Sequence, residues 1–442
     1  MNAAETRKDR PIRVDAVADH RGVRRGPFLL HIEPDRGGGT LVRVEMQPAE
    51  MTTDGEALAV SIAMPGLVNA HTHLDLSRIG PRPAPGPDAF TDWLEMVRTS
   101  RPSDPAAIDD AVRCGVELSQ AGGVVAVGDI GGAPGGRPTA AAFRALHATG
   151  MPGVSFTEFF AMGKREKAAL EHVERFCREQ REDAAALEPG RRARLGLQPH
   201  APYSCSRSAY RRAAELAAAF DPPLPLSTHL AETPEERTFI ADGVGPKRDF
   251  LEALGLWTDR AAADIGSGKH PVEHVQSAMP DGLAGWLLAH VNDASDAVIE
   301  ILAAAGASVA YCPRAASYFG IPSRAGPHRY REMLDAGVNV CLGTDSIINL
   351  DTADRISPLD DMRLLHRRDG TDPLTLLRMA TVNGAAALGL DPKLFELEAG
   401  RTSLGVLVLE PESAANADPL SAVLASDRPP RAMTLHTGIV PA

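Results

Sequence analysis

The sequence lacks the features that mark several specialised classes of protein. It has five cysteines in 442 residues, with no CxxC pair, and a chain of this length needs no disulfide framework, so we expect reduced thiols. It has no run of 18 apolar residues, and its first residues, MNAAETRKDRPIRV, have no apolar core. We therefore expect no membrane span, no export signal and a cytoplasmic location.

The charged residues also limit the possible partners. The net charge is −12, the sequence pI is about 5.6, and the basic residues form no long run. This balance argues against nucleic acid and against an anionic membrane surface, and leaves a small molecule as the expected partner. Hydrophobic residues make up 44% and charged residues 24% of the chain, as in globular proteins with a sizeable core.

The alternation of apolar runs with Ala- and Leu-rich stretches predicts an α/β fold. We count eight strand–helix units within residues 63–395, which predicts a (β/α)8 TIM barrel. Residues 1–62 and 396–442 have short β-rich stretches, and we expect them to pair into one small, composite, β-sandwich-like domain. The pattern places the first barrel strand at residues 60–71 and the last helix at residues 373–388.

Nearly every predicted barrel strand ends in a polar residue. Active sites of (β/α)8 enzymes lie at the carboxyl ends of the strands, so these side chains are expected to converge. The residues at or just past these ends are His71, His73, Asp129, Glu158, His200, His229, Glu232, His290, Arg314 and Asp345.

Four of these residues form a candidate metal site. His71 and His73 are two residues apart, so on an extended strand both imidazoles point to one side. His229 ends the fifth strand, and Asp345 closes the eighth, where Gly343 lets the backbone approach closely. Three imidazoles and one carboxylate suit Zn²⁺ best, with Fe²⁺, Mn²⁺ or Co²⁺ as alternatives. An HxH pair also arises by chance, and His229 with Glu232 has the alternative interpretation of a surface or capping pair.

Several sequence motifs resemble those of a known family. The runs PGLVNAHTHLDLS, GLQPHAPYSCS, THLAET, LLAHVND, GVNVCLGTDS and RMATVNGAAALGL are similar to those of the amidohydrolase superfamily. Within it the chain most resembles the chlorohydrolase and nucleoside deaminase branch, which includes aminodeoxyfutalosine deaminase and methylthioadenosine/S-adenosylhomocysteine deaminase. The resemblance implies one divalent metal, because RLGLQPH has no lysine at the position where binuclear members carry a bridging one.

The resemblance also implies roles for three residues. Asp345 would take a proton from the metal's water, and His290 would orient that water. Glu232 would protonate a ring nitrogen of the substrate and pass a proton to the leaving group.

Three further residues are candidates for substrate contact. His200 matches a position that contacts the substrate ring in deaminases, although a buried structural histidine is the alternative. Arg314 lies in CPR, where many relatives have a different run, and it either pairs with a substrate carboxylate or phosphate or caps a loop. Trp93 either covers the substrate or packs as part of a helix.

These observations predict a hydrolase of carbon–nitrogen bonds other than peptide bonds. The favoured activity is removal of ammonia from an aminated heterocycle or nucleoside. The alternatives are hydrolysis of a cyclic amide or imide, dechlorination of a triazine, and, more remotely, a metal-stabilised binding protein without activity. A homodimer or larger assembly is expected from the family.

Overall fold

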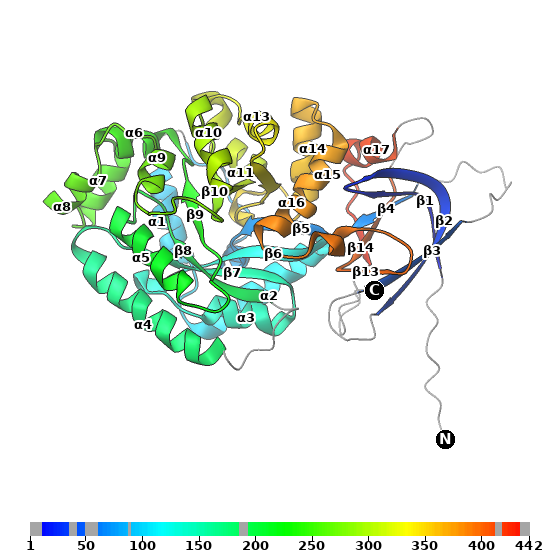
Figure 1. Ribbon diagram of the computed structural model, residues 1–442, viewed down its shortest axis with the longest axis horizontal. Coiled ribbons are helices and arrows are strands. Elements are labelled where there is room, and N and C mark those ends of the chain that lie inside the picture. The colour runs from blue at the N-terminus through cyan, green and yellow to red at the C-terminus, as the bar shows by residue number, and fades with distance from the viewer. Residues whose placement is uncertain are drawn as a thin grey trace, which may run out of the picture.

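The computed structural model describes residues 11–34, 42–48, 61–86, 90–184, 193–411 and 418–433. Figure 1 shows two units: a mixed β-sheet at one end of the molecule, and a larger unit in which helices surround parallel strands. We call them the composite sheet and the parallel-strand unit. The division of the chain into two domains at 62/63 and 395/396 stays a prediction.

The composite sheet combines strands from both ends of the chain. In the order β13-β3-β2-β1-β4-β14-β15, all neighbours are antiparallel except β1 and β4. Its core includes Val14, Leu30, Ala63 and Val406. The strands are β1 (Ile12–Asp19), β2 (Gly22–Pro34), β3 (Val42–Pro48), β4 (Ile62–Pro65), β13 (Arg401–Ser403), β14 (Val406–Leu409) and β15 (Arg431–Met433), and helix α17 (Pro419–Ala425) precedes β15.

The parallel-strand unit contains two four-stranded parallel sheets, ordered β5-β6-β7-β8 and β12-β11-β10-β9. Parallel bridges join their edges, from Leu197 to Leu226 on one side and from Thr72 to Asp345 on the other. β6 and β7 are buried along their whole length, as expected for parallel strands covered on both faces. The predicted α/β class is thus confirmed. The strands are β5 (Leu67–Thr72), β6 (Val124–Gly131), β7 (Gly153–Phe159), β8 (Ala193–Pro199), β9 (Ser227–Leu230), β10 (Leu287–His290), β11 (Ser308–Tyr311) and β12 (Asn339–Leu342).

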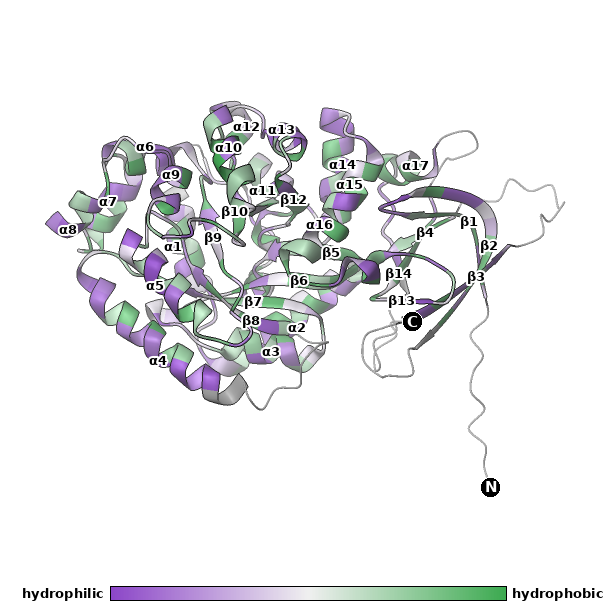
Figure 2. Ribbon diagram, viewed as in Figure 1, coloured by the Kyte–Doolittle hydropathy of each residue, from purple (hydrophilic) through white to green (hydrophobic). Residues whose placement is uncertain are grey.

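Amphipathic helices cover these strands. In α4, the residues Ala169, Val173, Phe176 and Gln180 recur every three or four positions and are buried, and Figure 2 shows hydrophobic and hydrophilic bands alternating along this helix. The helices are α1 (Phe90–Ser100), α2 (Pro105–Ala121), α3 (Ala141–Thr149), α4 (Glu166–Ala184), α5 (Arg207–Ala218), α6 (Pro234–Asp242), α7 (Pro246–Ala253), α8 (Asp259–Asp264), α9 (Pro271–Gln276), α10 (Asp296–Ala305), α11 (Pro313–Tyr318), α12 (Ile321–Ala325), α13 (Tyr330–Asp335), α14 (Pro358–Asp369), α15 (Pro373–Met379) and α16 (Val382–Ala387). Short 3-10 helices are η1 (Leu74–Ile79), η2 (Pro134–Gly136), η3 (Gly163–Arg165), η4 (Ile347–Asn349) and η5 (Pro392–Phe395).

Two predicted elements are each split in the structure. The predicted strand at residues 60–71 becomes β4 in the composite sheet and β5 in the parallel-strand unit, with Gly66 between them. A Cβ on Gly66 would lie 2.3 Å from a methyl carbon of Val125, so only glycine fits this close passage. The predicted helix at residues 373–388 breaks into α15 and α16 at Thr381 (φ −132°, ψ −94°), and the preceding carbonyl, of Ala380, accepts from the amide of Val68 in β5.

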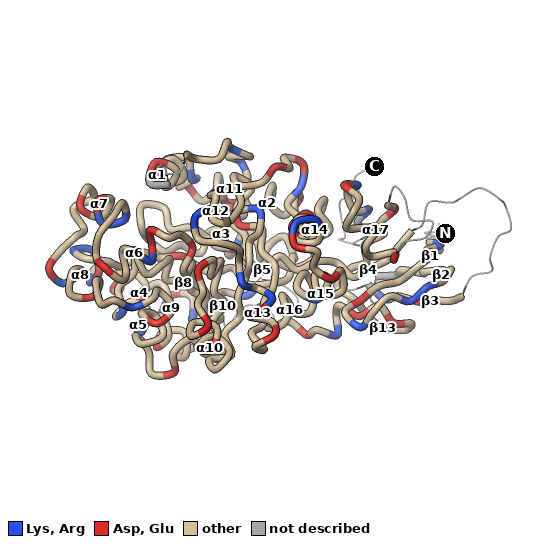
Figure 3. The backbone as a smooth tube through the Cα atoms, turned by 90° about the horizontal axis from the view of Figure 1, so that it is seen from above, with Lys and Arg blue, Asp and Glu red and all other residues tan. Residues whose placement is uncertain are grey.

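Charge is spread over both units. Figure 3 shows basic and acidic segments interspersed along the backbone, from α7 and α8 at one end to the composite sheet at the other. Among the described residues, no helix has the length and hydropathy needed to cross a bilayer.

Candidate metal centre

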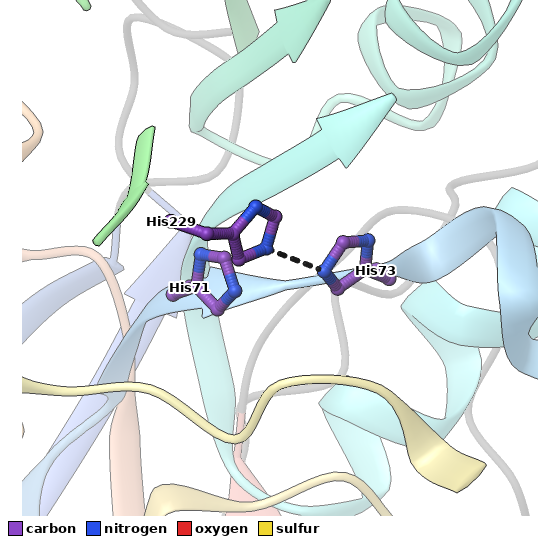
Figure 4. Close-up of side chains that lie close together, drawn as sticks. All are labelled: His71, His73 and His229. Atoms are coloured by element: carbon purple, nitrogen blue, oxygen red, sulfur yellow. Dashed lines mark hydrogen bonds between the residues drawn. The ribbon is translucent and has the colours of Figure 1, made fainter. Parts of the chain in front are cut away.

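The four predicted metal ligands lie together at the carboxyl ends of the parallel strands. His71 lies near the end of β5, His73 directly follows that strand, His229 comes from β9, and Asp345 follows β12. The Nε2 atoms of His73 and His229 are 3.3 Å apart, as Figure 4 shows. Asp345 Oδ1 lies 3.3 Å from His73 Nε2 and 3.8 Å from His71 Nε2. The three imidazoles thus form one cluster of possible ligand atoms, and Asp345 lies at its edge beside His71 and His73.

The backbone explains why Asp345 reaches the histidines. The amides of Thr344 and Asp345 both donate to the carbonyl of His71, at 3.0 and 3.1 Å. The chain can approach so closely because Gly343 has no side chain: a Cβ there would lie 2.8 Å from that of His71. Thr72, between the two histidines, points away from them and donates to the carbonyl of Asp345 at 3.0 Å.

These residues fit a divalent metal such as zinc. Both ring nitrogens of His71 are buried without a hydrogen-bond partner among the described residues. Zn–N bonds of about 2.05 Å give a tetrahedral edge of about 3.3 Å, which equals the spacing between His73 and His229. His229 Nδ1 donates to the carbonyl of His200 at 3.1 Å, which leaves Nε2 free as a ligand atom.

Burial keeps the ligand imidazoles neutral. Burial and then the neighbouring His229 hold the pKa of His71 well below its usual value, and burial lowers the pKa of His229 to about 4. Burial and then repulsion from Glu232 raise the pKa of Asp345 to about 8. Neutral imidazoles are the form that binds metal, and a cation would favour the ionised form of this carboxylate.

Glu232 and His290, the predicted acid–base pair, adjoin the metal ligands. Glu232 Oε1 lies 3.7 Å from His290 Nε2, and the ligand atoms of both lie within 4.8 Å of an Asp345 oxygen and of each other. The ring of His290 stacks on that of His229, with centroids 5.5 Å apart. Asn292 fixes the backbone of Glu232 by donating to its carbonyl at 2.9 Å. Proton-transfer groups and donor atoms thus share one buried site.

His200 also reaches this site. Its ring centroid is 5.0 Å from that of His229, and its Nδ1 lies 2.7 Å from the hydroxyl oxygen of Ser204. On its other side, Nε2 is 3.9 Å from an oxygen of Glu158. Its role in substrate binding stays a prediction.

Arg314 and Trp93 are engaged with other parts of the protein. The guanidinium of Arg314 pairs with Asp361 at 3.0 Å and with Asp351 at 3.2 Å, and donates to the carbonyl of Ser357 at 3.0 Å. These contacts favour the loop-capping alternative. Trp93 packs edge-on against Phe319, with ring centroids 5.0 Å apart. This contact is what helix packing predicts, and a substrate contact for either residue stays a prediction.

The structure adds two residues that the sequence did not single out. Asn349 donates to Asp345 Oδ2 at 2.6 Å and so leaves Oδ1 facing the histidines. Arg101, just after α1, donates to both oxygens of Asp75 at 2.8 and 3.1 Å and to Glu158 at 3.1 Å, and it lies 3.3 Å from His73 Nδ1. Spacing could not reveal these pairs, since the partners of Arg101 lie 26 and 57 residues away.

Comparisons with known proteins agree with this geometry. Residues 62–414 match the model of the amidohydrolase family, and the chain belongs to that family. The chain is 30% identical over 353 residues to an aminodeoxyfutalosine deaminase of Deinococcus radiodurans, covering 76% of this chain and 75% of that protein. It is 30% identical over 355 residues to a 5-methylthioadenosine/S-adenosylhomocysteine deaminase of Nitratidesulfovibrio vulgaris, covering 77% and 69% of the two chains.

A solved structure extends the likeness to the fold. The atrazine chlorohydrolase of Arthrobacter aurescens in complex with zinc has a TM-score of 0.67 and 22% identity, covering 93% of this chain and 90% of that one. The predicted family, and the class of metal-dependent hydrolase in its deaminase branch, are thereby confirmed. A divalent metal is supported by the donor set, in which three histidines form one candidate metal-binding group.

Proposed function

We propose that this protein is a metal-dependent hydrolytic deaminase of an adenine-type nucleoside, of the kind represented by aminodeoxyfutalosine or methylthioadenosine. The observation that carries the proposal is the convergence of Glu232 and His290 on a complete set of metal ligands. The likeness to two curated deaminases of these nucleosides supports the choice of substrate class.

The proposed ligands are His71, His73, His229 and Asp345, and the proposed metal is a single zinc ion. When bound, such a metal supplies a water molecule with a pKa near 7. Two edge bridges and a structural relative also support a closed (β/α)8 barrel, in which these ligands come from the carboxyl ends of the first, fifth and eighth strands.

The protein's own side chains then direct the protons. Asp345, held by Asn349 through Oδ2, keeps Oδ1 available to accept a proton beside the histidines. His290 presents Nε2, which is buried without a hydrogen-bond partner among the described residues, toward Glu232. Glu232 is placed to protonate a ring nitrogen and then the departing amine. His200 would contact the ring from the other side of His229.

The test is ammonia release from metal-loaded protein. The panel comprises adenosine, methylthioadenosine, S-adenosylhomocysteine, aminodeoxyfutalosine, guanine and cytosine. We expect release from at least one adenine nucleoside, and we expect Glu232→Gln to abolish turnover while metal content stays at one per chain. Glu235→Gln, which changes the nearby glutamate at the start of α6, is the matched control and should retain turnover.

Two outcomes would contradict the proposal. Retained activity in Glu232→Gln would remove this residue from the reaction. The wild-type enzyme could also release no ammonia from any compound of the panel. Release of chloride from a triazine would then favour the activity of the atrazine chlorohydrolase, and opening of a cyclic amide would favour the other alternative.

A further inference from the structure

A buried carboxylate accepts two hydrogen bonds from the turn that carries Glu232. Glu236, in α6, is fully buried, and its two oxygens accept from the amides of Ala231 at 2.8 Å and Glu232 at 3.1 Å. Ala231 has a φ of 49°, a left-handed conformation that an alanine adopts only when its surroundings enforce it. Glu236 therefore fixes the direction in which Glu232 leaves the strand.

A buried carboxylate needs a nearby cation, and Lys247 is placed to supply it. Lys247 begins α7 and is only 2% exposed. Attraction between its ammonium and the carboxylates of Glu236 and Glu232 opposes the effect of burial, which lowers the pKa of Lys247 to about 8. An isolated charge in this position would be strongly destabilising, so the lysine and Glu236 depend on each other.

Lys247 also contacts the opposite side of the site. Its Nζ lies 3.6 Å from the centre of the Tyr203 ring, a cation–π geometry. Tyr203 in turn packs edge-on against His200, with centroids 5.4 Å apart and the planes at 89°. The ammonium of Lys247 thus touches the ring that packs against His200.

We propose that Glu236 is a positioning residue, whose carboxylate holds the turn after β9 and thereby aims Glu232 at the substrate, with the Lys247 ammonium as its buried counter-charge. The role of Glu232 rests on the proposed function. The two hydrogen bonds that Glu236 accepts from the amides of Ala231 and Glu232, which we call the clamp, do not depend on it. A small misplacement of a proton donor can cost up to about a hundredfold in rate, so the effect should be measurable.

The experiment is a double-mutant cycle with Lys247→Met and Glu236→Gln, both zinc-loaded. Each single variant should lose about tenfold in kcat with KM and metal content nearly unchanged, and Lys247→Arg should recover part of the loss. The double variant should fall no further than the worse single variant, because both act through one clamp. Lys269→Met removes an exposed lysine that donates to Ser277, and it serves as the control that should match the wild type.

Amide exchange tests the clamp without any substrate. The amides of Ala231 and Glu232 should exchange faster in Glu236→Gln than in the wild type, and equal rates would overturn the proposal. Independent, multiplicative losses of kcat in the cycle would overturn it as well. The double variant removes both charges, and we expect it to fold even if a single variant, which leaves one buried charge unpaired, does not. A wild-type enzyme that is silent on every substrate would reject the proposed function, while the exchange rates would still decide the role of Glu236.

Discussion

Replacing Arg101 by methionine should destabilise the protein and tighten its hold on the metal. The Arg101 side chain is 14% exposed, and its partners Asp75 and Glu158 are 3% and 2% exposed. Methionine keeps much of the length but leaves two buried carboxylates without their cation. Removing one partner of a buried ion pair costs about 3–5 kcal/mol, which sets the expected loss in the free energy of unfolding.

The metal should respond through His73. Arg101 Nη2 lies 3.3 Å from His73 Nδ1, and a guanidinium can only donate, so this contact favours the tautomer with its proton on Nε2, the proposed ligand atom. Without Arg101 that proton can move to Nδ1, so the variant should bind zinc more tightly, within the range of about 10- to 100-fold that outer contacts of a ligand control. Chelator competition measures this affinity, and urea unfolding of the zinc-saturated proteins measures the stability.

Arg98→Met is the matched control on the preceding turn. Among the described residues Arg98 pairs with Glu95 alone, and the two side chains are 61% and 47% exposed, so the variant should be indistinguishable from the wild type. The double variant Arg101→Met with Glu158→Gln should recover part of the stability, because it no longer has the unpaired Glu158 carboxylate. If Arg101→Met unfolds and binds zinc as Arg98→Met does, the buried network has no energetic role and the reasoning is refuted.

Three other perturbations have expected outcomes. Asn349→Ala, which frees Asp345 Oδ2, should weaken zinc binding about tenfold in chelator competition, and unchanged affinity would contradict the positioning role. Chelation should lower the thermal midpoint, since a metal present at 100 times its Kd stabilises by about 2.7 kcal/mol, and equal midpoints would exclude a folding-linked metal. Burial lowers the pKa of His274 to about 4 from 6.5, so the folded state resists its protonation and stability is lost as pH falls from 6.5 toward 4. Between pH 7 and pH 5 this amounts to about 2 kcal/mol, and His274→Gln should show a correspondingly smaller loss in urea unfolding.

The proposed ligands could be picked out from the sequence because their signals are local. His71 and His73 are spaced for one face of a strand, and each further ligand follows its own apolar run. The supporting contacts have no such signal. Arg101 and Lys247 act on residues that only the packed fold brings near, and nothing in their sequence neighbourhoods marks them as buried.

The predicted boundaries of strands and helices were wrong where tertiary contacts override the local sequence pattern. The apolar run at residues 60–71 reads as one strand, yet the chain must leave the composite sheet and pass close to Val125, and Gly66 permits the change. Arg314 shows the same limit for side chains. Its position past a strand left substrate contact and loop capping as alternatives, and three aspartates on and before α14, which pair with its guanidinium, favour loop capping.

Backbone strain at the site also arises from tertiary contacts that the local sequence does not show. Over the described residues, the non-glycine positions with positive φ are Ala231, His290, Val291 and Asp345, and all lie at or next to the proposed catalytic groups. Each such conformation costs about 1–3 kcal/mol, and hydrogen bonds between neighbouring strand ends hold it. Val291 donates to the carbonyl of Leu230 at 2.9 Å, and Asp345 donates to that of His71 at 3.1 Å. These turns sharply redirect the chain just past the strands, and this is how Glu232, His290 and Asp345 come to face one point from three separate strands.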